Sequence, residues 1–180
     1  MNLLVIADDE SILSKMPECS ASVLISCGDL NEDTIVTIAQ RCRCSEVFAV
    51  KGNHDSSASF AFPVKDLHMQ VKEVGGVKFG GFCGAWRYKP RGNYLFEEAE
   101  VESLLRNFPA VDIFITHNSP RHIHDKDDDV HLGFAAFHQY LQRAKPKFML
   151  HGHQHVNCET VAGNTRIIGT YGFRFLVLPQ

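Results

Sequence analysis

The chain has 180 residues, of which 44% are apolar and 22% are charged, so it can bury a substantial hydrophobic core. A net charge of −3 gives no general attraction to nucleic acids or anionic membranes, and no apolar run approaches the length of a membrane span. The apolar run at the start is too short for a signal peptide and lacks a basic segment. We therefore expect one cytoplasmic domain over residues 1–180, without a membrane partner.

The first part of the chain alternates predicted strands with a predicted helix. Short apolar runs predict buried strands over Leu3–Ala7, Ser22–Ser26 and Glu46–Val50. Asn31–Cys42 begins with a capping residue type and carries apolar residues at helical spacing, which predicts a helix. After a loop at Phe60–Pro63, two runs on either side of Gly75-Gly76 predict a hairpin, Leu67–Val74 and Val77–Phe82.

The second part of the chain adds helices and more strands. Helices are predicted over Phe96–Phe108 and Gly133–Ala144, each followed closely by a proline. Strands are predicted over Asp112–Thr116, Lys147–His151, Val156–Val161, Thr165–Gly169 and Phe173–Leu178. This number of strands favours an α/β protein with two sheets packed face to face and helices outside, rather than one parallel sheet.

Five of the predicted strands are followed directly by residues of the kinds that bind metal ions. These residues are Asp8, Gly28-Asp29, Gly52-Asn53-His54-Asp55, His117 and Gly152-His153-Gln154-His155. The carboxyl ends of neighbouring parallel strands meet at one rim of a sheet, so we expect these side chains to converge. Each piece alone could be a turn, a core histidine or chance alternation in a strand. Together, and in this order, they predict a two-metal site.

The residue types indicate which metals would bind. Two divalent cations held close together need a bridging carboxylate, and Asp29 at a strand end suits that role. Carboxylate, amide and imidazole ligands together fit manganese, iron or zinc rather than a thiolate site. A glycine precedes three of the ligand loops, at Gly28, Gly52 and Gly152, where it allows a tight backbone turn.

These motifs resemble those of the calcineurin-like metallophosphoesterase superfamily. The family pattern is Asp-x-His, Gly-Asp, Gly-Asn-His-Asp/Glu, a lone His and Gly-His-x-His, and the resemblance extends from Asp8 to His155. The small size resembles the short bacterial and archaeal phosphodiesterase branch, which implies a two-sheet α/β/β/α sandwich. The resemblance implies one metal bound by Asp8, Asp29 and His155, with Glu10 at the position of a further ligand, and a second bound by Asp29, Asn53, His117 and His153.

Glu10 stands where the family usually has a histidine. As a surface carboxylate it would leave the first metal one ligand short; as a ligand it would replace the imidazole. We expect ligation, because a carboxylate is a competent ligand for such ions. With Asp8 and Asp29 it would offset much of the metal charge and favour a harder ion. We therefore expect Mn2+, with Fe, Zn2+, Ni2+ and Mg2+ as alternatives.

The resemblance also implies a mechanism of direct hydrolysis. A water shared by the two metals would lose a proton near neutral pH and attack phosphorus in line. His54 would protonate the departing oxygen as general acid. Asp55 would either orient His54 or cap the following segment. The expected substrate is a phosphodiester, from the resemblance to the short branch, and the alternative within the family is a phosphomonoester.

A binding module without turnover is the alternative from another functional class. A subunit of an endosomal sorting coat resembles this fold and acts as a protein platform. The carboxylate at Glu10 favours this alternative, whereas His54 argues against it, because a platform has no use for a leaving-group acid.

Three further features of the sequence bear on partners and environment. The segment Trp86–Arg91 combines aromatic and basic residues, and would either contact a nucleotide or form a structural loop with Trp86 in the core. The six cysteines show no CxxC pair, and Cys42 and Cys44 are too close for an ordinary disulfide, so we expect reduced thiols. Exposed edge strands would allow a homo-oligomer.

Overall fold

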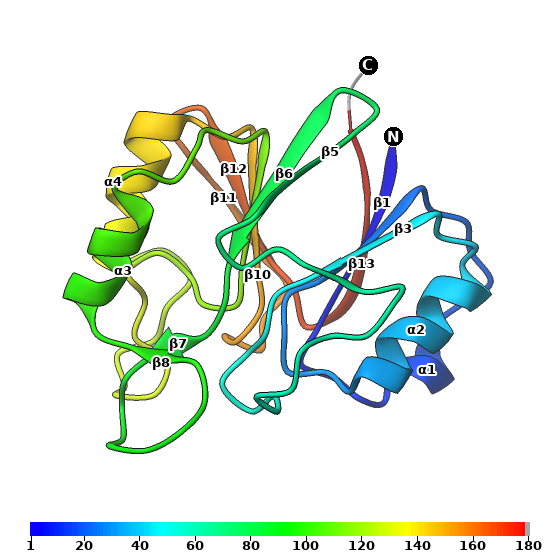
Figure 1. Ribbon diagram of the computed structural model, residues 1–180, viewed down its shortest axis with the longest axis horizontal. Helices are drawn as coiled ribbons and strands as arrows, with labels where there is room; N and C mark the ends of the chain where they lie inside the picture. The colour runs from blue at the N-terminus through cyan, green and yellow to red at the C-terminus, as the bar shows by residue number, and fades with distance from the viewer. Residues whose placement is uncertain (179–180) are drawn as a thin grey trace.

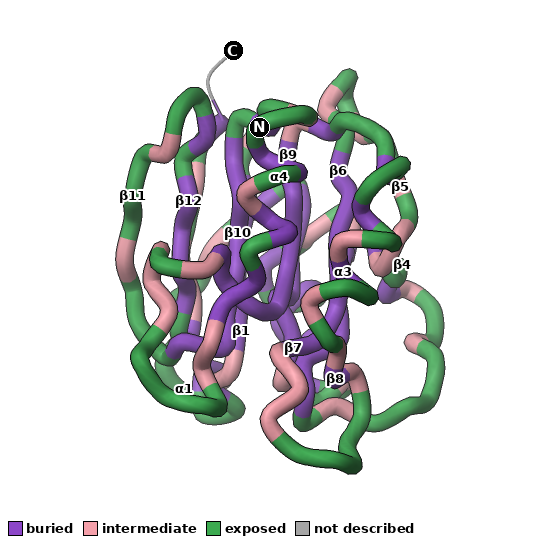
Figure 2. The backbone as a smooth tube through the Cα atoms, turned by 90° about the vertical axis from the view of Figure 1, so that its left-hand side faces the viewer, coloured by how far each residue is buried: buried purple, intermediate pink, exposed green. Residues whose placement is uncertain are grey.

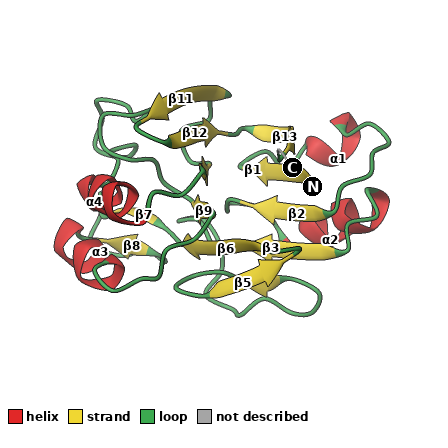
Figure 3. Cartoon of the chain, turned by 90° about the horizontal axis from the view of Figure 1, so that it is seen from above, coloured by secondary structure: helices red, strands yellow, loops and turns green. Residues whose placement is uncertain are grey.

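The computed structural model describes residues 1–178 and shows two β-sheets packed face to face between two pairs of helices (Figure 1). The first sheet has the strand order β13-β1-β2-β3-β4, and the second has the order β11-β12-β10-β9-β6-β5. Helices α1 and α2 cover the outer face of the first sheet, and α3 and α4 cover the outer face of the second (Figure 3). The predicted α/β/β/α sandwich is confirmed.

The first sheet is parallel at its centre and antiparallel at one edge. Its strands are β1 (Asn2–Ala7), β2 (Val23–Ser26), β3 (Glu46–Ala49), β4 (Lys65–Asp66) and β13 (Gly172–Val177). The helices α1 (Ile12–Lys15) and α2 (Glu32–Arg41) connect β1 to β2 and β2 to β3. The last strand, β13, returns antiparallel to β1, which brings the two ends of the described chain close together.

The second sheet has four parallel strands flanked by a hairpin partner on each side. Its strands are β5 (Val71–Val74), β6 (Val77–Phe82), β9 (Ile113–Thr116), β10 (Phe148–His151), β11 (Cys158–Ala162) and β12 (Thr165–Gly169). The helices are α3 (Glu98–Leu105) and α4 (Ala135–Ala144). A separate small pair, β7 (Ala85–Trp86) and β8 (Leu95–Phe96), lies at the lower end of the molecule in Figure 1.

Alternation of side chains along β1 shows how the layers are held together. Leu3, Val5 and Ala7 belong to the core between the two sheets, whereas Leu4 and Ile6 pack beneath α1 and α2. All five are almost completely buried, so the strand is apolar from Leu3 to Ala7. Strands at the centres of the sheets are buried along their length, and the outer strands β5 and β11 are exposed (Figure 2).

The predicted helices and long strands are confirmed with small changes at their ends. The predicted strand Leu67–Val74 is shorter in the structure, because its first half forms only an isolated bridge between His68 and Gly81. Helix α1 and the two-residue strands β4, β7 and β8 were not predicted, since segments this short show no periodicity.

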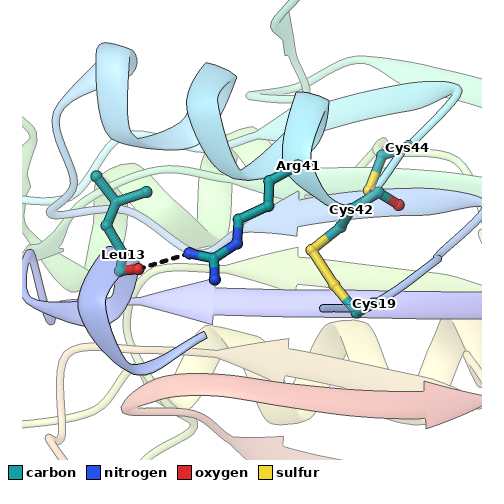
Figure 4. Close-up of a disulfide and its surroundings, with 5 residues drawn as sticks. All are labelled: Leu13, Cys19, Arg41, Cys42 and Cys44. Carbon is teal, nitrogen blue, oxygen red and sulfur yellow. Dashed lines mark hydrogen bonds between the residues drawn. A yellow bond between two sulfur atoms is a disulfide. The ribbon is translucent and has the colours of Figure 1, made fainter. Parts of the chain in front are cut away.

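The cysteines differ from the expectation of reduced thiols. Cys19 and Cys42 form a disulfide that ties the segment after α1 to the end of α2 (Figure 4). The spacing argument considered Cys42 and Cys44 only, whereas the partner of Cys42 is 23 residues away. Cys27, Cys44, Cys83 and Cys158 are free. In residues 1–178 no helix is both long and apolar enough to cross a membrane.

Candidate metal centre

The candidate site lies in the loops that follow β1, β2, β3, β9 and β10. Within each sheet the parallel register brings these strand ends together, as in the pairing of Ser26 with Ala49. Hydrogen bonds then join the loops of the two sheets. The backbone N–H of His153, from the second sheet, donates to Asp8 Oδ2 of the first sheet at 2.9 Å. The site is therefore built across the sandwich, at one rim of both sheets.

Three side chains meet closely enough to share a metal ion. Ligand-type atoms of Asp29, His117 and His153 all lie within 4.8 Å of one another. His117 Nε2 is 3.3 Å from Asp29 Oδ2 and 3.0 Å from the side-chain oxygen of Asn53. These four residues follow four different strands, and the structure brings them together as the sequence motifs predicted.

Backbone carbonyls fix the orientation of both histidine rings. His117 Nδ1 lies 2.7 Å from the carbonyl oxygen of Cys27, and His153 Nε2 lies 3.0 Å from that of Val130. A carbonyl oxygen can only accept, so these nitrogens carry the hydrogens. In the neutral rings this leaves His117 Nε2 and His153 Nδ1 with free lone pairs. Metal-binding histidines typically donate their outer N–H in this way.

Asp8 supplies a buried oxygen that has no partner. Its side chain is 0% exposed, and among the described residues Oδ1 accepts no hydrogen bond. The His155 ring nitrogen Nε2 lies 4.0 Å from this oxygen. Burying a carboxylate oxygen without a partner is costly, and a cation at this position would remove that cost. This oxygen fits a divalent metal bound between Asp8 and His155.

Four of the predicted ligands have a backbone conformation that L-residues rarely adopt. The φ angles of Asp8, Asp29, His153 and His155 are 64°, 55°, 62° and 52°. Such conformations cost roughly 1–3 kcal/mol each and are found mainly where function requires them. Here the left-handed conformation occurs in the turns that follow β1, β2 and β10.

Glycine is needed where the loops of two predicted ligands touch. A Cβ on Gly52 would collide with Asp29 Oδ1 and would lie 2.6 Å from His117 Cε1. A Cβ on Gly28, which has φ of 98°, would lie 2.7 Å from His117 Nδ1. Any larger residue at either position would displace a ligand-type atom.

The Asp55 carboxylate joins the same two loops. Its Oδ2 accepts hydrogen bonds from the N–H groups of Gly52 at 2.7 Å and Asp29 at 3.0 Å. The neighbouring His54 donates its own N–H to Asp29 Oδ1 at 2.8 Å and leaves its side chain exposed at the rim. The sequence suggested two roles for Asp55, and neither included this bridge. A catalytic role for His54 or Asp55 stays a prediction.

Glu10 is placed at the start of α2 and outside the cluster of Asp29, His117 and His153. Its carboxylate accepts hydrogen bonds from the N–H of Asn31 and from Thr34 Oγ1. A carboxylate at a helix N-terminus is stabilised by the free N–H groups there. In this position Glu10 anchors the segment after Asp8 to the segment after Asp29. Its ligation of a metal stays a prediction.

The charges of the site are strongly coupled. Burial raises the pKa of Asp8 to about 7. Burial opposes the charged form of His117, but the carboxylates of Asp29 and Asp8 outweigh it and raise that pKa to about 9. Burial likewise opposes the charged form of Asp29, whereas His117 lowers its pKa below the usual range. Burial and the nearby positive His117 lower the pKa of His153 to about 3, so this ring is neutral. Without metal, His117 thus carries the positive charge that offsets the carboxylates.

Two polar residues that support the site were not identified from the sequence. Gln154 is buried, and its Nε2 donates to Asn118 Oδ1, Ser119 Oγ and the carbonyl oxygen of His131 at 3.1, 3.1 and 2.9 Å. These bonds hold the loop after β9 against the ligand loop. Tyr88 accepts a hydrogen bond from Asn53 Nδ2 at 3.2 Å. The position of Gln154 between two predicted ligands was the only signal for its role.

The model of the calcineurin-like phosphoesterase superfamily domain matches residues 4–170. The chain belongs to this superfamily. Calcineurin-like phosphoesterases are mostly metal-dependent, which gives the activity class as phosphoester hydrolysis and divalent metal ions as the cofactor class. No curated protein matches the chain in a sequence search.

Solved structures share the calcineurin-like fold at low sequence identity. The protein TT1561 of Thermus thermophilus is 10% identical, with a TM-score of 0.63 over 94% of this chain and 88% of that one. Phosphopantetheinyl hydrolase from Mycobacterium tuberculosis is 16% identical, with a TM-score of 0.60 over 99% and 96%. Wild-type Vps29 from Entamoeba histolytica, complexed with Zn2+, is 15% identical, with a TM-score of 0.53 over 95% and 74%. These similarities support the fold.

Proposed function

We propose that this calcineurin-like protein is a phosphodiesterase with two metal ions. The observation that carries the proposal is the convergence of Asp29, His117 and His153 within 4.8 Å, beside the unpartnered Asp8 Oδ1. Asp29 would bridge the two ions. The remaining proposed ligands are Asp8, Glu10 and His155 for one ion, and Asn53, His117 and His153 for the other.

The donor set supports Mn2+ as the preferred ion. Carboxylate and amide oxygens are hard ligands, and three carboxylates beside one cluster favour a hard ion over a soft one. Fe, Zn2+, Ni2+ and Mg2+ remain the alternatives, and the Zn2+ complex of Vps29 is compatible with zinc in this fold. When bound, the ions would lower the pKa of a water and stabilise negative charge on the phosphoryl group.

The side chains of the protein would then orient the substrate and move the proton. The exposed His54 ring stands at the rim, and its backbone N–H donates to Asp29, which supports a role in protonating the departing oxygen of a bound ester. Asp55 would act as a positioning residue, because it keeps the His54 loop against the Asp29 loop. The outer N–H bonds of His117 and His153 would keep their rings turned toward the ions.

The preference for diesters rests on the similarity in size and motifs to the short phosphodiesterase branch. The name of the Mycobacterium tuberculosis neighbour supports hydrolysis in this fold without identifying a substrate for this chain. A nucleotide-containing diester is one candidate within this class.

If His54 is the general acid, the activity lost on removing it should depend on the leaving group of the substrate. With Mn2+, the protein should cleave bis-p-nitrophenyl phosphate faster than p-nitrophenyl phosphate. The variant His54→Ala should lose roughly 100-fold or more on a dinucleotide, whose alkoxide leaving group needs a proton. It should lose much less on bis-p-nitrophenyl phosphate, whose phenolate leaves without one.

Two results would reject parts of this proposal. Cleavage of the monoester alone would exclude the diesterase assignment. Equal losses on both diesters in His54→Ala would exclude general acid catalysis by His54. Asn53→Ala serves as the control for metal binding and should impair both diesters alike.

A scaffold without turnover is the second candidate function, and the placement of Glu10 favours it. A Glu10 carboxylate that stays on α2 leaves the ion at Asp8 with one ligand fewer. The fold similarity to Vps29 is compatible with this candidate. Diester turnover by the Mn2+-loaded protein, and its loss in His54→Ala and Asn53→Ala, separates the two, because a pure scaffold would show no turnover whether or not it binds ions.

We also propose a cytoplasmic location and pairing of edge strands in a homo-oligomer. Disulfides are rare in reducing compartments, so a cytoplasmic location requires that the Cys19–Cys42 bond is reduced in cells. Alkylation of both thiols in rapidly lysed cells would support a cytoplasmic location, and protection of both would reject it.

The exposed Val161 and Val177 on edge strands β11 and β13 support self-association, which a monomeric mass by light scattering would refute.

A further inference from the structure

A loop far along the chain lies against the proposed ligand loop. Residues 87–94, which we call the tyrosine loop, connect β7 to β8 at the rim of the sandwich. Three hydrogen bonds join it to residues 53–56. They link Tyr88 Oη with Asn53 Nδ2 at 3.2 Å, Asn93 Nδ2 with the Asp55 carbonyl at 3.0 Å, and Tyr94 Oη with the Ser56 carbonyl at 3.3 Å. The first of these bonds reaches a side chain of the metal centre.

Trp86, which precedes the loop, and Arg87, its first residue, fix the position of the loop. Trp86 packs against Phe134, with ring centroids 6.1 Å apart, and the guanidinium of Arg121 lies 5.2 Å from its ring. Arg87 is paired with Glu97 at 3.1 Å. Trp86 and Arg87 are therefore occupied by the protein itself, which favours the structural alternative for this segment over base stacking. These contacts fix the backbone next to Tyr88.

Tyr88 contacts the side-chain amide of Asn53, whose oxygen is the proposed metal ligand. Only the amide oxygen can bind a cation, and it lies 3.0 Å from His117 Nε2, beside Asp29. The amide nitrogen, on the other side of the same planar group, donates to Tyr88. Asn53 is 5% exposed, so bulk water cannot freely replace this acceptor. Without the Tyr88 hydroxyl, the Asn53 amide would lose the hydrogen bond that fixes the orientation of its plane.

We propose that Tyr88 is a positioning residue of the metal centre, which holds the Asn53 amide so that its oxygen faces His117 and Asp29. The inference rests on the proposed function, since it requires Asn53 to be a metal ligand. Partners of metal ligands typically contribute 10-fold to 100-fold in metal affinity or activity. Because a neutral hydroxyl is a modest partner, we expect an effect near 10-fold.

The test compares two tyrosines of the same loop. Tyr88→Phe removes the hydroxyl that contacts Asn53, and Tyr94→Phe removes the hydroxyl that contacts the backbone of Ser56. Mn2+ affinity is measured by isothermal titration of metal-stripped protein, with thermal melting as a check on folding. We expect Tyr88→Phe to bind Mn2+ about 10-fold more weakly and to recover its kcat at saturating Mn2+. Tyr94→Phe should bind Mn2+ as the wild type does.

A double-mutant cycle with Asn53→Ala separates this inference from the proposed function. If Asn53→Ala leaves Mn2+ affinity unchanged, Asn53 is not a ligand, and both its place in the proposed ligand set and the role of Tyr88 are overturned, whereas the phosphodiesterase proposal is tested separately by turnover. If Asn53→Ala weakens binding but Tyr88→Phe does not, only the role of Tyr88 is overturned. An equal loss in Tyr94→Phe would also overturn it, because the effect would then belong to the loop. In the Asn53→Ala background, Tyr88→Phe should have no further effect.

Discussion

At the scale of single residues, two proposed metal ligands, His117 and Asp8, carry protons in the metal-free site. His117 has a pKa raised to about 9 by the carboxylates of Asp29 and Asp8, against the effect of burial, and Asp8 has a pKa raised by burial to about 7. Both groups therefore carry protons at neutral pH, His117 fully and Asp8 partly. A metal must displace these protons, because ligands bind in their deprotonated forms.

Mn2+ affinity should consequently rise with pH. His117 alone predicts an increase of roughly tenfold per pH unit below its pKa of about 9. Isothermal titration between pH 6 and 8, in buffers of different ionisation enthalpy, should show release of one to two protons per bound pair of ions. His153, whose pKa is lowered by burial, is neutral and releases none. Affinity that is independent of pH would contradict the assignment of His117 as a ligand.

The sequence predicted the residues of the site better than their contacts. Asp29, Asn53, His117 and His153 could be identified because each follows an apolar strand, and parallel strands bring their ends together. The contacts of Asp55 could not be predicted, since spacing does not show which N–H groups a carboxylate accepts from. Tyr88 lies 35 residues from Asn53, and no local pattern connects the two.

At the scale of elements, the disulfide links the two segments that carry the first proposed ligands, Asp8 and Asp29. Asp8 precedes α1 and Asp29 precedes α2, while Cys19 and Cys42 join the far ends of the same two segments. Glu10 joins their near ends through Asn31 and Thr34. The disulfide and the Glu10 hydrogen bonds thus connect the α1 and α2 segments at both ends.

Loss of the disulfide should lower the free energy of unfolding by roughly 3 kcal/mol, because it closes a loop with a sequence separation of 23 residues. Guanidinium unfolding of Cys19→Ser tests this, with the free and half-buried Cys158→Ser as control. Reductant should destabilise the wild type by the same amount and leave Cys19→Ser unchanged. Equal stability with and without reductant would contradict the prediction.

Long elements and short ones differ in how well the sequence predicted them. Helix α4 and strand β6 were evident because several residues repeat one pattern. Strands β7 and β8, with two residues each, contain no repeat to detect. The pairing of Cys19 with Cys42 was equally hidden, because cysteine connectivity does not follow from spacing.

At the scale of the whole molecule, the site exists only because two sheets pack together. The first sheet supplies Asp8, Asp29 and Asn53, and the second supplies His117 and His153. The core cluster between the sheets includes residues of both, among them Val5 and Ile115. We therefore propose that the chain is one domain and unfolds in a single transition; two separate guanidinium transitions would contradict this.

The most direct test of the account is the position of metal ions in crystals grown with Mn2+. Anomalous density should show two peaks roughly 3.5–4 Å apart on either side of the Asp29 carboxylate. One peak should contact Asn53, His117 and His153, and the other should contact Asp8, Glu10 and His155. Absence of any peak at Asp29, in crystals that contain Mn2+, would contradict the central claim that these loops form a metal centre.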